Sequence, residues 1–133
     1  MKVFITADIE GITGATHWDD TNSNKSDNQP ISKQMSEEVA AACRGAFKGG
    51  ATEIFVKDSH GSGRNIDPNI LPENVTLIRG WTGNPDLMVS GIDESFDALM
   101  FVGYHSACGI NGNPLSHAIN TQPYFIKING EKC

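Results

Sequence analysis

The sequence of 133 residues lacks a basic cluster and a long apolar run. Its 16 acidic residues outnumber its 10 basic residues, the basic residues are scattered, and the formal net charge is −6. An acidic chain of this kind is a poor candidate for binding nucleic acid or an anionic membrane, so we expect neither as a partner. The N-terminal apolar stretch is only about five residues long, which is too short for a membrane span or for the core of a signal peptide.

Cysteine is also scarce, and its spacing excludes two classes of protein. Cys43, Cys108 and Cys133 are an odd number, lie far apart in the chain and form no CxxC motif. This pattern argues against a disulfide scaffold and against a zinc finger, and it favours a reducing compartment. We therefore expect a cytoplasmic protein.

Short apolar runs alternate with one long amphipathic segment. In residues 32–48, apolar side chains recur every four positions, which predicts a helix with Ser32 as its N-cap and Gly49 just after its end. Residues 12–31 are polar and predict a long loop, and residues 86–92 predict a helical turn. Five runs predict strands: 3–7, 53–57, 75–79, 98–104 and 124–128, with Asn129-Gly130 as a turn after the last. The sequence therefore predicts a single α/β domain over residues 1–133, with a mostly parallel sheet flanked by helices.

Acidic and imidazole side chains follow three of these predicted strands. Asp8 and Glu10 follow the first strand, His60 the second, and His105 the fourth. The carboxyl ends of parallel strands meet at one edge of a sheet, where α/β proteins place their ligands. Asp8 and Glu10 are two residues apart, so both carboxylates point to the same side of an extended chain.

Carboxylates and imidazoles without a thiolate form a ligand set typical of hydrolytic zinc or manganese. A divalent cation also removes the cost of burying two acids side by side. Taken singly, Asp8 suits a turn and each histidine suits an exposed loop. Together at matching strand ends, the four residues predict a metal site at the C-terminal ends of the strands. Asp58 is predicted to be a turn residue or to orient one of the metal ligands without binding the metal itself.

Five motifs occur in the order ADIEGITG, THWDD, KDSHGSGRN, FVGYHS and PLSHAIN. This series resembles the binuclear-zinc D-aminopeptidase family (DppA type) over essentially the whole chain. The resemblance implies that Asp8, Glu10, His60 and His105 bind zinc, with two ions per complete subunit, and that His117 is catalytic. It further implies release of N-terminal D-amino acids from short peptides or amides by a metal-activated water, with Asp8 bridging the two ions. A ring-shaped homo-oligomer is expected on the same basis.

This sequence departs from the pattern of the family in one feature. Family members are longer and carry a further zinc-binding glutamate a few residues after the NG turn, whereas Glu131 lies too close to that turn to match it. We therefore expect an N-terminal α/β domain, with the C-terminal half of the family fold absent from this chain.

Two other functions remain open from the residues alone. A metal-dependent phosphohydrolase would also use acids at strand ends, although the sequence has no P-loop and only one cation, Arg64, in a candidate loop. A non-catalytic metal-binding module would keep the fold without turnover. By their placement in loops, four further residues are candidates for shaping a substrate pocket: His17, Trp18, Arg64 and Asn65.

Overall fold

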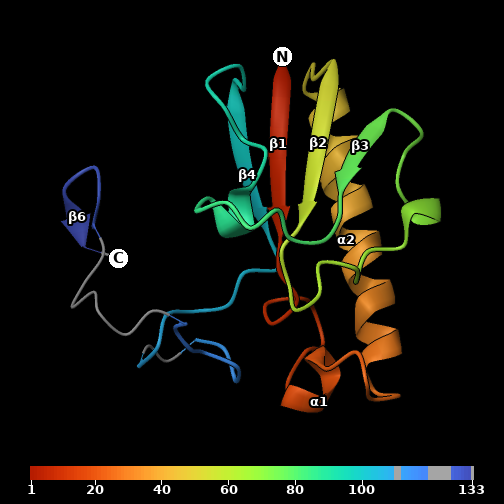
Figure 1. Ribbon diagram of the computed structural model, residues 1–133, viewed down its shortest axis with the longest axis vertical. Coiled ribbons are helices and arrows are strands. Elements are labelled where there is room, and N and C mark those ends of the chain that lie inside the picture. The colour runs from red at the N-terminus through yellow and green to blue at the C-terminus, as the bar shows by residue number, and fades with distance from the viewer. Residues whose placement is uncertain (110–111, 120–126, 133) are drawn as a thin grey trace.

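The computed structural model describes residues 1–109, 112–119 and 127–132. Its centre is a four-stranded sheet in the order β3-β2-β1-β4, in which every neighbouring pair is parallel (Figure 1). The strands are β1 (Lys2–Ala7), β2 (Glu53–Asp58), β3 (Val75–Ile78) and β4 (Ala98–Val102). The predicted α/β class and parallel sheet are confirmed.

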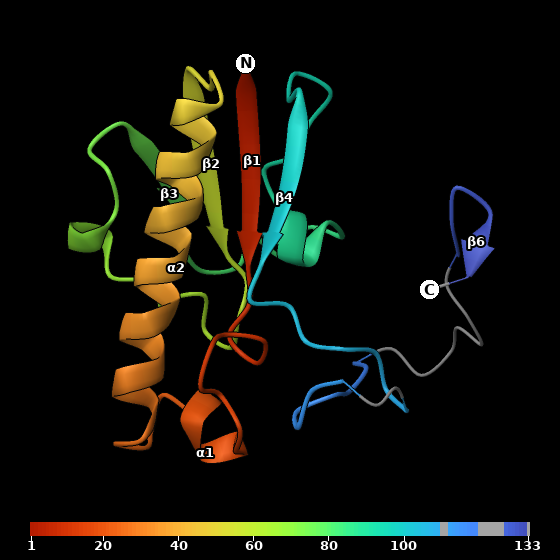
Figure 2. The ribbon, with the colours of Figure 1, turned by 180° about the vertical axis from the view of Figure 1, so that it is seen from behind.

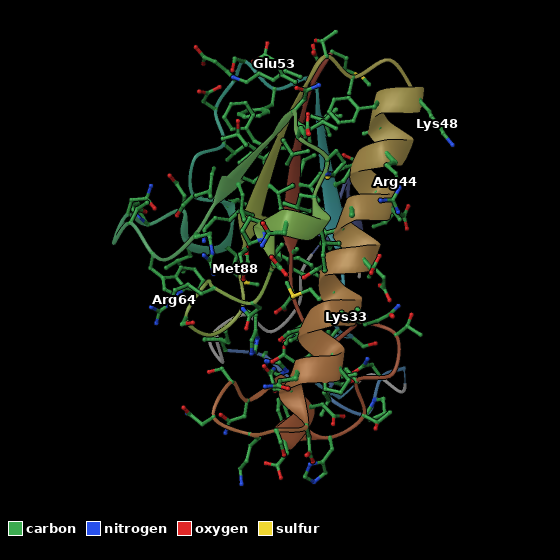
Figure 3. The ribbon with its side chains drawn as sticks, turned by 90° about the vertical axis from the view of Figure 1, so that its right-hand side faces the viewer. Lys33, Arg44, Lys48, Glu53, Arg64 and Met88 are labelled. Atoms are coloured by element: carbon green, nitrogen blue, oxygen red, sulfur yellow. The ribbon has the colours of Figure 1, made fainter. Side chains whose placement is uncertain are left out.

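One long helix, α2 (Asn28–Lys48), covers one face of the sheet (Figure 2). Its buried side chains Met35, Val39 and Cys43 pack into the same core as the apolar residues of β1 and β2. Its basic side chains Lys33, Arg44 and Lys48 are exposed on the side away from the sheet (Figure 3). The predicted apolar face of the helix is therefore the one that contacts the sheet.

The start of this helix and the loop before it differ from the prediction. The helix begins at Asn28, and Ser32 lies inside it, where its hydroxyl donates to Asn28 Oδ1. Pro30 does not prevent this earlier start, because the first turn of a helix needs no backbone N–H bonds. The predicted loop also contains a short helix, α1 (Trp18–Thr21). The Asn28 side chain donates to the Asp20 carbonyl and so joins the two helices.

The other face of the sheet is covered by the connection between β3 and β4. Phe96 of this connection contacts Phe4 and Phe55 edge-on, with ring centroids 5.1 and 5.3 Å apart. The connection contains the 3₁₀ turn η2 (Leu87–Val89), within the predicted helical turn. A second 3₁₀ turn, η1 (Pro68–Ile70), precedes β3.

The predicted turn at Asn129-Gly130 joins a small hairpin of β5 (Lys127–Ile128) and β6 (Glu131–Lys132). Both turn residues have positive φ angles, 52° and 88°, as a two-residue hairpin turn requires. Residues 124–126 of the predicted last strand lie outside the described residues. Among the described residues, no helix is long and apolar enough to cross a membrane.

Two glycines allow the ends of β1 and β4 to approach each other closely. Gly103 has a φ of 68°, and a Cβ there would collide with the Asp8 carbonyl oxygen. A Cβ on Gly11 would collide with the Tyr104 carbonyl oxygen, and the Gly11 N–H donates to the Gly103 carbonyl at 2.7 Å. Gly103 also ends β4 earlier than predicted. The contact brings the segments that follow both strands side by side.

Candidate metal centre

Asp8, Glu10 and His60 meet where β1 and β2 end. Asp8 and Glu10 are only 3% and 4% exposed. His60 Nδ1 lies 3.4 Å from Asp8 Oδ1 and 3.1 Å from Glu10 Oε2. One ligand atom of each residue lies within 4.8 Å of the other two. The structure thus brings together three of the four residues predicted from the strand ends in one compact cluster.

The orientation of His60 is set by α1. His60 Nε2 lies 2.9 Å from the Thr21 carbonyl oxygen. A carbonyl only accepts, so Nε2 carries the proton, and Nδ1 is the nitrogen directed at the two carboxylates. A backbone carbonyl that fixes the imidazole tautomer in this way is the usual support for a metal-binding histidine. Thr21 could not be identified from the sequence, because it contributes a backbone atom that any residue carries.

His105 lies at the margin of this cluster. Its Nε2 is 3.8 Å from Asp8 Oδ2, while its Nδ1 donates to the Ser106 carbonyl at 2.9 Å. The His117 ring stacks on the His105 ring, with centroids 3.8 Å apart and planes 19° apart. His117 Nδ1 donates to the Leu115 carbonyl at 2.8 Å, and its Nε2 has no hydrogen-bond partner among the described residues. His117 is thus held beside the cluster through its contact with His105.

Asp58 holds the loop that carries His60. This fully buried carboxylate accepts hydrogen bonds from the backbone N–H groups of Asn65 and Ile66, at 2.6 and 2.8 Å. The Asn65 side chain bonds both Asp58 Oδ1 and the His60 carbonyl, at 2.9 and 2.7 Å. Asp58 therefore acts on the loop of His60 and not on its imidazole ring.

The three clustered residues shift one another's proton affinity. Burial raises the pKa of Asp8, and the adjacent Glu10 carboxylate adds to this effect. Burial also opposes ionisation of Glu10, but hydrogen bonds with His60 and Asp8 outweigh it and lower the pKa of Glu10 to about 2. Burial disfavours a charged His60, yet its bonds to both carboxylates raise the pKa of His60 to about 10. The cluster therefore strongly favours a positive charge between the carboxylates.

The donor set fits zinc. Two carboxylates and one imidazole, with further imidazole nitrogen at the margin, are ligands that this ion accepts. Among the described residues, the neighbourhood offers no thiolate, because Cys43 is buried in the core and Cys108 does not line the site. A divalent cation carries enough charge to neutralise both carboxylates at once.

The cluster forms one side of a cavity of about 280 Å³. Residues that the strand-end pattern did not single out complete the lining: Ser59, Gly61, Trp81, Met88 and Ile119. Trp81 follows the end of β3 by three residues, so applying the strand-end reasoning to this strand as well could have identified it. The sequence carried no comparable signal for Met88, which reaches the cavity only through the folding of the β3–β4 connection.

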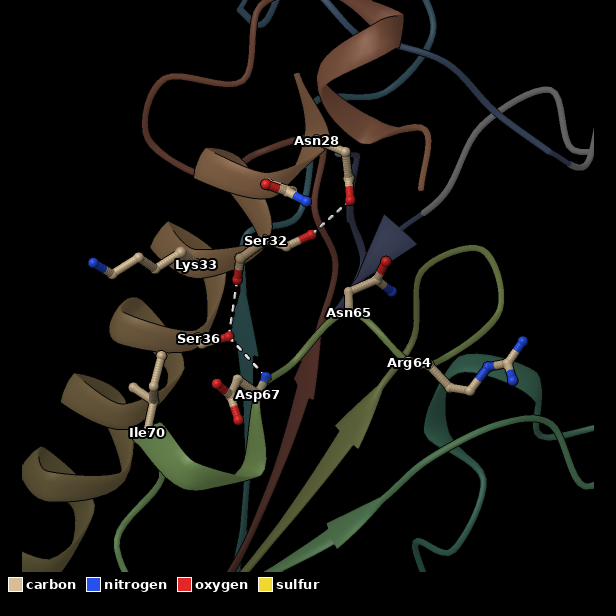
Figure 4. Close-up of a pocket in the computed structure, with 9 residues that line it drawn as sticks. Asn28, Ser32, Lys33, Ser36, Arg64, Asn65, Asp67 and Ile70 are labelled. Carbon is tan, nitrogen blue, oxygen red and sulfur yellow. Dashed lines mark hydrogen bonds between the residues drawn. The ribbon is translucent and has the colours of Figure 1, made fainter. Parts of the chain in front are cut away.

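The four residues suggested for a substrate pocket have different positions. Trp18 contacts His117 edge-on, with ring centroids 5.2 Å apart. His17 is an exposed N-cap of α1 and does not line the metal cavity. Arg64 and Asn65 line a second cavity of about 420 Å³ beside the N-terminal half of α2 and, like His17, do not line the metal cavity. Figure 4 shows the Arg64 and Lys33 side chains directed away from each other at this second cavity.

A family model described as D-aminopeptidase (peptidase M55) matches residues 1–133. The chain belongs to this family. A D-aminopeptidase of Bacillus subtilis (strain 168) is 35% identical over 119 residues, which cover 90% of this chain and 43% of the relative. The fold is also similar to the structure of DppA from Bacillus subtilis, described as a Zn-dependent D-aminopeptidase and a self-compartmentalizing protease. The TM-score is 0.85 at 30% identity, over 100% of this chain and 48% of that one. The chain thus spans less than half the length of these D-aminopeptidases.

Proposed function

We propose that this chain is the N-terminal α/β domain of a zinc-dependent aminopeptidase that releases N-terminal D-amino acids from short peptides or amides. The observation that carries the proposal is the buried cluster of Asp8, Glu10 and His60, open to a cavity beside His117. Membership in the D-aminopeptidase family and the zinc dependence of the related DppA support it.

In this proposal, Asp8, Glu10 and His60 would hold zinc, and His105 would be the fourth ligand that this chain supplies. Zinc bound there supplies Lewis-acid chemistry and activates water at neutral pH. Asp8 is the candidate to bridge two ions, because its two oxygens face different histidines. Oδ1 lies 3.4 Å from His60 Nδ1, and Oδ2 lies 3.8 Å from His105 Nε2.

His117 is the proposed catalytic residue. Its Nδ1–H donates to the Leu115 carbonyl, so Nε2 can accept a proton from the attacking water and later deliver it to the leaving amine. Stacking on His105 and the edge contact with Trp18 hold the ring in place. The backbone bond supports Nε2 as the atom for the proposed proton transfer.

Further properties follow from the family relation as proposals. We propose two zinc ions per complete subunit, a cytoplasmic location and a homo-oligomer, in line with the description of DppA as self-compartmentalizing. Phosphate-ester chemistry is disfavoured, because the described residues that line the metal cavity include no lysine or arginine.

A direct test uses the zinc-loaded, full-length gene product and D-alanyl and L-alanyl p-nitroanilides. We expect hydrolysis of the D-enantiomer, and we expect His117→Ala to lower kcat by about 100-fold or more without loss of bound zinc. His17→Asn serves as the matched control, because asparagine retains the N-cap of α1 outside the cavity. Unchanged turnover in His117→Ala would remove the catalytic assignment, and activity on a phosphate ester alone would refute the peptidase proposal.

A further inference from the structure

The lining of the metal cavity also includes three apolar side chains, which are together called its apolar wall: Trp81, Met88 and Ile119. We propose that this wall binds the side chain of the substrate's N-terminal residue and selects large apolar D-residues over D-alanine. The inference rests on the proposed function and names the substrate class for that site.

A hydrogen bond and a cation–π contact hold the Trp81 ring in place. Its indole N–H donates to the Gly61 carbonyl at 2.7 Å, next to His60 in the sequence. The Lys57 ammonium lies over the indole, 4.5 Å from the ring centroid, and donates to the Gly80 carbonyl at 2.8 Å. Trp81 nevertheless stays 45% exposed. A large apolar ring that is anchored and still exposed is prepared for contact with a ligand.

Met88 is anchored independently of Trp81, on the side of the sheet opposite α2 (Figure 3). Its carbonyl accepts hydrogen bonds from Thr6 Oγ1 and Ser59 Oγ, both at 2.7 Å. These hydroxyls belong to residues that lie two positions before Asp8 and one position before His60. The apolar wall is therefore positioned by the same two strand ends that position the metal cluster.

The size of the cavity and its apolar lining restrict which substrate side chains can bind there. About 280 Å³ is below the usual range for drug-sized ligands, so the space suits one residue beside the metal cluster. The side chain of Ile119 is 86% exposed, and a substrate side chain that covers it removes apolar surface from water. The favoured occupant is an uncharged, branched or aromatic side chain.

The test compares the p-nitroanilides of D-leucine and D-alanine with the zinc-loaded, full-length protein. We expect kcat/KM to favour D-leucine by about tenfold or more, as expected for several added methylene groups in an apolar pocket. Calorimetry with the free D-amino acids should show the same order of affinity, independently of turnover. Trp81→Ala should bring two ratios of D-leucine to D-alanine, that of kcat/KM and that of binding affinity, close to one. Trp81→Phe should retain most of both preferences.

Two further variants make the result independent of folding defects. Ile119→Ala changes a highly exposed residue of the wall, and we expect it to reduce the D-leucine preference several-fold. Leu87→Ala is the matched control, because Leu87 is exposed beside Met88 but does not line the cavity. It should leave both ratios unchanged.

The outcomes separate this inference from the proposed function. Equal hydrolysis of D-leucyl and D-alanyl substrates would overturn the inference and leave the peptidase proposal intact. A D-leucine preference that survives both Trp81→Ala and Ile119→Ala would also overturn it. Tighter binding of D-leucine without hydrolysis, lost in Trp81→Ala, would support the wall while refuting the peptidase proposal. If the protein shows no hydrolysis of these substrates and no binding of the free D-amino acids, both the inference and the peptidase proposal are overturned.

Discussion

His60 is placed so that either a proton or a metal ion can lie between it and the two carboxylates. Its Nδ1 faces Asp8 and Glu10, and these contacts raise its pKa from the ordinary 6.5 to about 10. In protein stripped of metal by a chelator, the resulting ion pair stabilises the fold fully below pH 6.5. That contribution is lost as the pH rises through 10, because the folded state then releases the proton.

This protonation predicts that zinc binding releases a proton. Zinc needs the unprotonated Nδ1, so at pH 7.5 each zinc bound at His60 should displace about one proton. Calorimetric titration of chelator-treated protein in buffers of different ionisation enthalpy measures this number. Zinc affinity should also rise by up to about tenfold per pH unit from pH 7 toward 10. Zinc binding with no proton release would contradict the placement of His60 as a ligand through Nδ1.

The close contact between the ends of β1 and β4 predicts that a side chain added at Gly103 weakens zinc binding. Gly103→Ala should displace the chain at Asp8 and lower zinc affinity by about tenfold or more, because the added Cβ collides with a backbone atom that cannot move freely. Gly45→Ala is the control, since a Cβ there meets nothing within 4 Å. It should leave zinc affinity unchanged and stabilise α2 by about 0.5–1 kcal/mol. Equal zinc affinity in the two variants would show that the glycine contact does not position the site.

The strands and the site they form could be predicted from sequence because the evidence is local. Apolar runs mark the strands, and parallel strands bring the residues after them together, so the clustering of Asp8, Glu10 and His60 could be predicted. The start of α2 could not be predicted, because residues 19–28 contain many possible helix caps. The choice depends on the bond from Asn28 to Asp20, which exists only once the chain has folded. The position of Met88 depends in the same way on hydroxyl groups from two distant strands.

At the scale of the whole molecule, the metal cluster joins segments that are distant in the chain. Asp8 and Glu10 follow β1, His60 follows β2, and His60 in turn binds the Thr21 carbonyl of α1. A cation held by these residues connects both central strands and the short helix. Zinc that binds only the folded protein should therefore stabilise the whole fold.

Thermal unfolding tests this connection. Zinc at about 100 times its dissociation constant should add about 2.7 kcal/mol to the free energy of unfolding and raise Tm by several degrees. Asp8→Asn should lose most of this increase, whereas the exposed α2 variant Glu37→Gln should retain it. The same Tm in zinc and in chelator for the unmodified protein would contradict a structural metal link between the strands.

An anomalous diffraction map of zinc-loaded crystals, recorded on both sides of the zinc absorption edge, shows directly whether this cluster binds zinc. We expect a zinc peak at about 2.0–2.2 Å from a carboxylate oxygen of Asp8, a carboxylate oxygen of Glu10 and Nδ1 of His60. A map with no peak at this cluster, or with zinc bound only elsewhere in the protein, would contradict the proposed zinc site.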